Sequence, residues 1–219
     1  MKNFLYKEIK LCLTPINYFY LLFLTMLIIP NYPKYVGFFF LCVSLLYIFI
    51  NAELNNDIQY SMILPINKRD MVKSRCILVC AYQILGIIIS VPLSFLAPII
   101  SPSGNVAGIE ANAACYGLTF ILFAVFDFVF FTQYYKKAEK PGIPFLFAGI
   151  TFWIFYAIFE IPIWGKDSFG VEYFKIMDKI DFESQIKQLP IFFAGLIIYF
   201  AGWILTYKVS AKRFEKADL

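Results

Sequence analysis

The chain alternates between long apolar stretches and shorter polar segments. A helix crosses a bilayer with about 20 apolar residues, and a charge at mid-bilayer is costly. Stretches without Asp, Glu, Lys or Arg therefore mark candidate spans, and one of them continues past a single acid, Asp127. The pattern predicts an all-α integral membrane protein with one domain over residues 1–219. Its six spans are expected at about 13–30, 35–51, 76–99, 113–135, 143–162 and 189–207.

The composition agrees with this class and excludes several functions. The chain is 61% hydrophobic and only 16% charged, whereas roughly a quarter of the residues of a soluble domain are charged. It contains no His, the commonest metal ligand and the usual proton shuttle, so most hydrolase and metalloenzyme classes are excluded. The five Cys fall in or beside the predicted spans, where packing is expected rather than metal binding.

The distribution of basic residues predicts the orientation. Of the 19 Lys and Arg residues, 14 lie in the two termini and in the connections after spans two and four. Basic residues near helix ends are retained in the cytoplasm, so both termini are expected there. We interpret the net charge of +4 as this topology signal, and we expect no nucleic-acid partner.

A polar segment between the second and third spans, residues 51–75, reads NAELNNDIQYSMILPINKRDMVKSR. Residues 53–64 can form a short helix with an apolar face, and Pro65 ends it because proline lacks the amide hydrogen. Asn67 is a suitable cap for a second helix that begins at Lys68 and continues into span three. The segment therefore predicts a helix–Pro–helix elbow on the cytoplasmic side.

This elbow resembles a segment of ABC-2 type permeases, in which a short acidic helix precedes a Leu-Pro-Val-Ser-Arg-like turn and a basic helix start. In that family the segment is the coupling helix, which docks in a groove of a separate ATP-binding subunit. Here the usual Gly is absent from Asn55-Asn56-Asp57, and Asn67 replaces the usual Ser. The alternative is a plain basic loop that holds the topology. The resemblance implies ATPase contacts for Glu53, Asp57, Ile58, Met62, Leu64, Pro65, Asn67, Lys68 and Arg69.

Two further segments have amphipathic periodicity. The first 14 residues place Leu5, Ile9 and Cys12 at helical spacing, which predicts a helix that is either a topology anchor or a contact for a cytoplasmic partner. The external linker 165–188 predicts another helix, which either caps the pathway or lies flat on the membrane. Its apolar positions are Phe169, Tyr173, Ile176 and Ile180.

Two acids fall within the predicted spans and are candidate pathway residues. Asp127 lies in the inner half of span four, where an ionisable side chain by default marks a functional site. A structural hydrogen bond between helices is the alternative. Glu160 lies near the outer end of span five, within reach of water or of Lys166, and is also typical of an interfacial residue.

The chain lacks the phosphate-loop pattern of Gly, four residues, and Gly-Lys-Ser/Thr, so we expect no catalytic residues and no ATP hydrolysis by this chain alone. The resemblance implies two ABC ATPase subunits that carry ATP and Mg, a second copy of this chain, and no cofactor on the chain itself. It also implies a multi-pass protein of a bacterial cytoplasmic membrane.

The expected substrate is an amphipathic peptide or a lipid-like molecule, because the spans are rich in Phe and Tyr and carry almost no fixed charge. The chain is similar to small six-span permeases that export phenol-soluble modulins, and also to permeases that protect cells against lantibiotics. Two other classes stay open: an intramembrane enzyme, although the two deep acids lie on different spans, and a non-transporting accessory protein.

Overall fold

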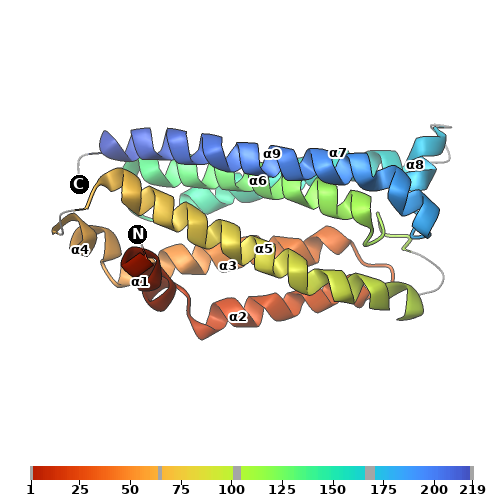
Figure 1. Cartoon of the computed structure of the whole chain (residues 1–219), viewed down its shortest axis with the longest axis horizontal. Helices are drawn as coiled ribbons and strands as arrows, with labels where there is room; N and C mark the ends of the chain where they lie inside the picture. Colours follow the sequence, from red (N-terminus) through yellow and green to blue (C-terminus); the bar gives the residue numbers. More distant parts are fainter. Residues whose placement is uncertain (1, 64–65, 101–104, 166–170, 218–219) are drawn as a thin grey trace.

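The computed structural model describes residues 2–63, 66–100, 105–165 and 171–217, and its regular structure in these ranges is entirely helical. The long helices run side by side along one axis (Figure 1). Both termini and α4 lie at one end, which we call the basic end, and α8 lies at the opposite end. The α-helices are α1 (Lys2–Cys12), α2 (Pro15–Leu22), α3 (Lys34–Leu54), α4 (Asp57–Ile63), α5 (Lys68–Ile100), α6 (Ala113–Lys137), α7 (Gly142–Trp164), α8 (Glu172–Met177) and α9 (Phe182–Glu215).

Five of these helices, α3, α5, α6, α7 and α9, are long and apolar enough to cross a membrane. The first predicted span is instead a short α2 followed by a 3-10 helix, η1 (Phe23–Ile28). Counting α1 and this segment as one bent pair gives up to six spans, with a bend of 78° between them. The bend has a local cause, because Pro15 has no amide hydrogen and the Thr14 amide donates to Asn17 Oδ1 at 2.9 Å.

Two helices are longer than their apolar stretches. The helix containing span three begins at Lys68, and the helix containing span six extends over Phe182–Glu215. The Asp181 carboxylate caps α9 by accepting a hydrogen bond from the Ser184 amide at 3.0 Å, which lowers the pKa of Asp181. Because α9 begins so early, the predicted external helix is reduced to α8 in the described part of the linker.

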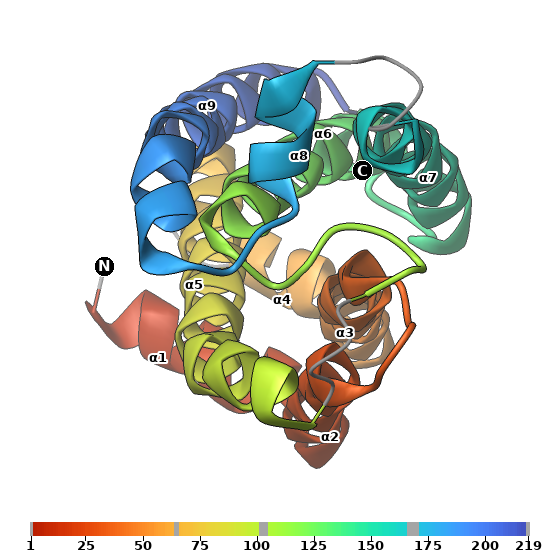
Figure 2. The same cartoon turned by 90° about the vertical axis from the view of Figure 1, so that its right-hand side faces the viewer.

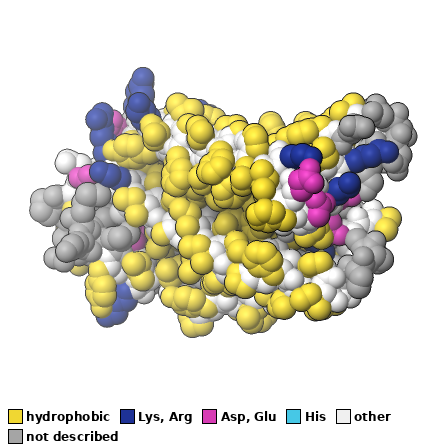
Figure 3. Space-filling view, turned by 45° about the vertical axis from the view of Figure 1, so that its right-hand side comes forward, with side chains coloured by type: hydrophobic (Ala, Val, Ile, Leu, Met, Phe, Trp, Pro, Cys, Tyr) yellow, Lys and Arg dark blue, Asp and Glu magenta, His cyan; other side chains and the backbone are white. Residues whose placement is uncertain are grey.

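On the face shown in Figure 3, hydrophobic side chains form a band across the middle of the molecule, and charged side chains gather near its two ends. This is the surface expected of a membrane-spanning bundle. The inner helix is α6, with 78% of the residues in its most apolar stretch buried, against 22% for α9. The outer faces of α7 and α9 therefore present apolar side chains to the surroundings.

Small residues bring α6 and α9 into close contact. Gly195 of α9 lies directly against the Gly117 carbonyl of α6, and a Cβ at Gly117 would lie 2.6 Å from the Ile191 oxygen. Two turns further, a Cβ at Gly202 would lie 3.0 Å from that of Ala124. Small residues at such spacing let helix backbones approach closely in a membrane, so this crossing fixes α9 on the inner helix.

The end that carries α8 is covered by the loop between α5 and α6, whose green segment, residues 105–112, crosses the end of the bundle in Figure 2. Its side chains tie distant segments together. Asn105 donates to the Tyr32 carbonyl at 3.2 Å, and Asn112 donates to the Met177 carbonyl at 2.7 Å. The loop thus connects the first helices to the α8 region.

The glycine crossing generates a prediction. Gly195→Ala should lower the free energy of unfolding by about 1–3 kcal/mol, the usual cost of overpacking, because the new methyl group meets the backbone of α6. Gly142→Ala is the control, since no atom lies within 4 Å of a Cβ placed there. Thermal unfolding of the detergent-solubilised protein measures both, and equal melting temperatures for the two variants would contradict the tight crossing.

Candidate functional site

The elbow between α3 and α5 is built from local backbone signals. Asn56 has a φ of 49°, a left-handed conformation that Asn tolerates better than most residues, and it separates α3 from α4. The Asn67 carbonyl accepts hydrogen bonds from the Asp70 and Met71 amides at the start of α5. Leu64 and Pro65 lie outside the described residues. The α4 helix and the start of α5 both lie at the basic end (Figure 1).

A buried ion cluster holds this elbow against the bundle. The Arg75 guanidinium of α5 contacts Glu8 of α1 at 2.7 Å and hydrogen-bonds to Asp57 of α4 at 2.8 Å. Lys7 forms an ion pair with the other Asp57 oxygen, and the guanidinium lies 5.2 Å from the centre of the Phe49 ring. The side chains of Arg75, Asp57 and Glu8 are only 5%, 3% and 2% exposed. We call Lys7, Glu8, Asp57 and Arg75 the Arg75 cluster.

The same place holds three groups that are able to ligate a metal, Glu8, Cys12 and Asp57, whose ligand atoms lie within 4.8 Å of one another. Both carboxylates, however, are paired with the Arg75 guanidinium, which is a fixed positive charge. A metal ion would have to displace this internal cation. The arrangement fits a structural link between α1, α4 and α5 better than a metal centre.

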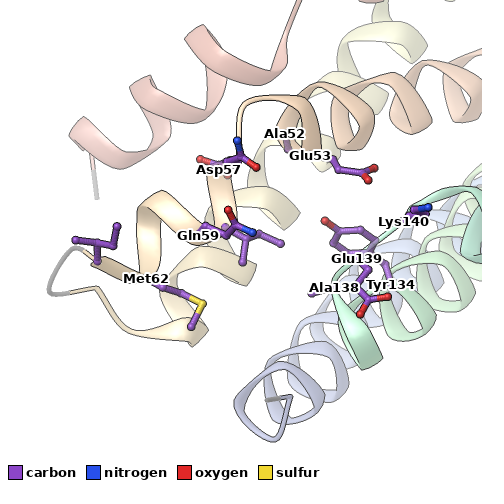
Figure 4. A pocket seen from close by; sticks show the side chains of 12 residues that line it. Ala52, Glu53, Asp57, Gln59, Met62, Tyr134, Ala138, Glu139 and Lys140 are labelled. Carbon is purple, nitrogen blue, oxygen red and sulfur yellow. The ribbon is translucent and has the colours of Figure 1, made fainter. Parts of the chain in front are cut away.

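A groove runs beside α4 at the basic end. It encloses about 670 Å³ between the α3–α4 segment and the C-terminal end of α6 (Figure 4). Met62 on one wall faces Tyr134 and Ala138 on the other, and Ile58 also lines the groove. The groove also contains charged side chains at its edge, from Glu53, Glu139 and Lys140. It is an apolar cleft with a charged margin, open at the surface.

The residues that sequence analysis implicated in ATPase contact lie in three environments. Glu53, Met62, Asn67 and Arg69 are exposed, and Ile58 and Lys68 are partly buried. Asp57 is buried in the Arg75 cluster. The most exposed large apolar side chain of α4 is Ile63, at 84%, which is not among the residues implicated in ATPase contact. The groove face of α4 therefore has an apolar centre, and its acid, which also lines the groove, is paired with Arg75.

The basic half of the elbow packs against the end of α9. Lys68 donates to the Ala217 carbonyl at 2.9 Å, and its ammonium lies 5.5 Å from the centre of the Phe214 ring. The Arg69 guanidinium makes a two-point contact with the Glu215 carboxylate. The start of α5 and the end of α9 are thus joined, so a displacement of the elbow acts on both helices.

Sequence analysis missed Glu8 and Arg75 as site residues. One signal was present for each: Glu8 is the only acid among the basic residues of the first segment, and Arg75 directly precedes a long apolar stretch. Neither signal identifies the partner, because the two residues are far apart in the chain. Their pairing depends on the packing of α1 beside α5.

Asp127 lies in a buried hydrogen-bonded chain across three helices. The Gln83 side chain of α5 donates to Asp127 Oδ1 at 3.0 Å, and the Tyr199 hydroxyl of α9 donates to Gln83 Oε1 at 2.8 Å. Asp127 is 1% exposed. The geometry favours the cross-helix hydrogen bond that sequence analysis held as the alternative to a pathway role.

Glu160 is distant from Asp127, at the end that carries α8. It is fully buried, and its carboxylate accepts a hydrogen bond from the Ile109 amide at 3.1 Å. A Cβ at Gly108 would lie 2.6 Å from this carboxylate, so the small residue allows the approach. Glu160 therefore holds the covering loop in place. Its expected contact with Lys166 is not described, because Lys166 lies outside the described residues. Burial also raises the pKa of the neighbouring Glu110 carboxyl.

The Arg75 cluster generates a prediction. Arg75→Gln should lower the free energy of unfolding by about 3–5 kcal/mol, because it leaves Glu8 buried without its counter-charge and leaves Asp57 with Lys7 alone. Arg69→Gln removes an exposed pair and should cost at most about 1 kcal/mol. Combining Arg75→Gln with Glu8→Gln and Asp57→Asn should restore part of the loss. Unfolding of the purified protein in detergent measures all three, and an equal effect of the two single variants would contradict a central role for Arg75.

Comparison with known proteins adds the family. No curated protein and no solved structure matches the chain. One protein family does match: the description of that family is ABC-2 family transporter protein, and the match extends over residues 3–215. ABC-2 permeases generally work with ABC ATPase partners, and the apolar helices described above agree with a multi-pass membrane component. The chain therefore belongs to the ABC-2 family of transporter proteins, as the permease subunit of an ABC transporter.

Proposed function

We propose that this chain is the permease of an exporter in a bacterial cytoplasmic membrane, driven by ATP that a separate subunit hydrolyses. The observation that carries the proposal is the elbow: α4 presents an exposed apolar face beside a groove of about 670 Å³, while its inner face is fixed by Asp57 to Arg75. A docking element needs such a division, because the free face binds the partner and the held face transmits the force.

The orientation follows from charge. The basic end carries both termini and the elbow (Figure 1), and 14 of the 19 Lys and Arg residues belong to the segments on this side. The positive-inside rule places these segments in the cytoplasm, where ATP and Mg are available to the partner. The complete transporter would contain two copies of this chain and two ATPase subunits.

The buried contacts supply a route for coupling. A load on α4 reaches α5 through Asp57 and Arg75, and it reaches α1 through Glu8. A load on the start of α5 reaches α9 through the pair of Arg69 and Glu215. Interfaces of this kind change between discrete arrangements rather than deforming continuously. Docking at the elbow is therefore able to shift α1, α5 and α9 together.

The proposed cargo is an amphipathic peptide. Exposed aromatic side chains such as Tyr18, Phe19 and Phe95 suit a molecule with an apolar face, and the membrane band carries little fixed charge to bind a small ion (Figure 3). Expulsion of antimicrobial peptides uses the same chemistry and is the alternative outcome of a cargo test.

The docking proposal predicts that Met62→Glu combined with Ile63→Glu disrupts copurification with the ATP-binding subunit, because charges replace the apolar centre of the groove face. Tyr60→Glu is the matched control, since Tyr60 is exposed on α4 but does not line the groove. Affinity purification of the tagged chain from cells that produce both subunits measures association. Loss in the control as well would contradict the groove as the docking face, and association in every variant would contradict docking at α4.

The cargo proposal predicts ATP-dependent uptake of a labelled amphipathic helical peptide by inverted vesicles that contain both subunits. A scrambled peptide of the same composition, without an apolar face, is the control. Equal uptake of the two peptides would show that amphipathicity is not recognised. Uptake limited to antimicrobial peptides would favour the immunity role over export of the cell's own peptides.

A further inference from the structure

A second cavity at the basic end has a composition unlike that of the groove. It encloses about 430 Å³ where the start of α5 meets the end of α9, and we call it the α9 pocket. Its lining is basic and aromatic, with a single acid. The residues concerned are Arg69, Tyr207, Lys208, Lys212, Glu215 and Lys216.

The charges of the α9 pocket are only partly neutralised by the residues that the structure describes. Glu215 is held by Arg69 in a two-point contact, so this pair contributes little net charge. Lys208, Lys212 and Lys216 are exposed, and no ion pair joins them to another residue in the part of the chain that the structure describes. Within the described residues, three cations therefore converge on one cavity without an ion-pair partner, which indicates an anionic ligand.

The surface next to the α9 pocket indicates what kind of anion. Ile197, Ala201, Ile204, Lys208 and Lys212 recur at spacings of four, three, four and four, so they share one face of α9. All five are exposed. The face changes from apolar to basic at Lys208, as a phospholipid changes from acyl chain to phosphate.

The length of this apolar face matches one leaflet. Lys208 lies eleven positions after Ile197, which corresponds to about 16 Å along a helix. Half of a hydrocarbon core is about 15 Å. An acyl chain along this face would end near mid-bilayer when its phosphate lies among the three lysines. Tyr207, beside them, belongs to the residue type that favours the headgroup level.

We propose that the α9 pocket binds the phosphate headgroup of an anionic phospholipid from the cytoplasmic leaflet, with an acyl chain lying along the exposed face of α9. The site goes beyond the proposed transport function and depends only on the basic end facing the cytoplasm. A free phosphate would use the lysines but not the apolar face. A protein partner would use the exposed cations but would not require that face to match a leaflet.

The position of the α9 pocket gives the lipid a further effect. Arg69 and Glu215 both line it and join α5 to α9. A bound phosphate beside this pair adds negative charge next to Arg69 and Lys212, which holds the two helix ends together. The lipid thus acts at the same junction through which the elbow reaches α9.

The test measures binding of a fluorescent phosphatidylglycerol to the full chain in a neutral detergent. Each basic residue near an anionic lipid contributes about 1 kcal/mol, or about fivefold in affinity. Lys208→Gln combined with Lys212→Gln should therefore weaken binding on the order of 25-fold. Lys136→Gln with Lys137→Gln is the matched control, because these exposed lysines end α6 at the same end of the bundle. The control should bind as the unchanged protein does.

Two competitors distinguish the sources of the phosphate. Phosphatidylcholine and inorganic phosphate should both fail to displace the bound lipid at concentrations at which unlabelled phosphatidylglycerol displaces it. Ile197→Ser with Ile204→Ser should weaken lipid binding several-fold, because these changes shorten the apolar face without altering charge. The melting temperature of each variant confirms that it is folded.

Several results would overturn the proposal. Equal weakening in the two lysine pairs would indicate general surface charge, and displacement by inorganic phosphate would indicate a free-anion site. Unchanged lipid binding together with lost ATPase association in the Lys208 and Lys212 variant would assign the pocket to the partner protein. Because the lipid measurement uses no ATPase and no transport, its failure leaves the exporter proposal standing, and the converse also holds.

Discussion

The charge of Arg75 must be neutralised inside the protein, and the arrangement of the basic end depends on this requirement. A buried guanidinium is costly unless acids approach it with good geometry, and the two acids that do so come from α1 and α4. Neither helix is long enough to be stable alone in water. The cluster therefore gives both short helices a fixed place against α5, and it makes the position of any one of them depend on the other two.

Buried polar groups at other depths of the bundle also have partners on other segments of the chain. Gln83 links Asp127 to Tyr199 between α5, α6 and α9, and Asn17 of α2 donates to Ser44 of α3. At the end that carries α8, a backbone amide satisfies the Glu160 carboxylate. Each contact joins elements that are distant in sequence, whereas the outer faces are simply apolar. Polar groups set which helices are neighbours, and the glycine crossing of α6 and α9 sets how closely they pack.

Much of this fold follows from the sequence, because the absence of charge over about 20 residues is a strong signal in itself. Five spans and the start of α5 at Lys68 lie where that signal and the elbow pattern predicted them. The 3-10 segment in the first span was not expected, since apolar residues alone do not distinguish a 3-10 helix from an α-helix. Residues such as Asp57 and Glu160 show a second limit of prediction from the sequence. Their types mark them as notable, but whether a carboxylate faces water or a buried partner depends on contacts between distant segments, which periodicity does not encode.

The bent first segment has a consequence for the lipid around it. The α2 helix and η1 together contain 14 residues, which extend about 24 Å at their respective rises. A typical hydrocarbon core is about 30 Å thick. Either the bilayer beside this segment therefore becomes thinner, or the polar residues that flank the segment lie within the hydrocarbon core and extend to its surface. Such hydrophobic mismatch costs a fraction of a kcal/mol per Å and is relieved when another short segment lies alongside. The exposed side of α2 is consequently a place where membrane thickness acts on the protein.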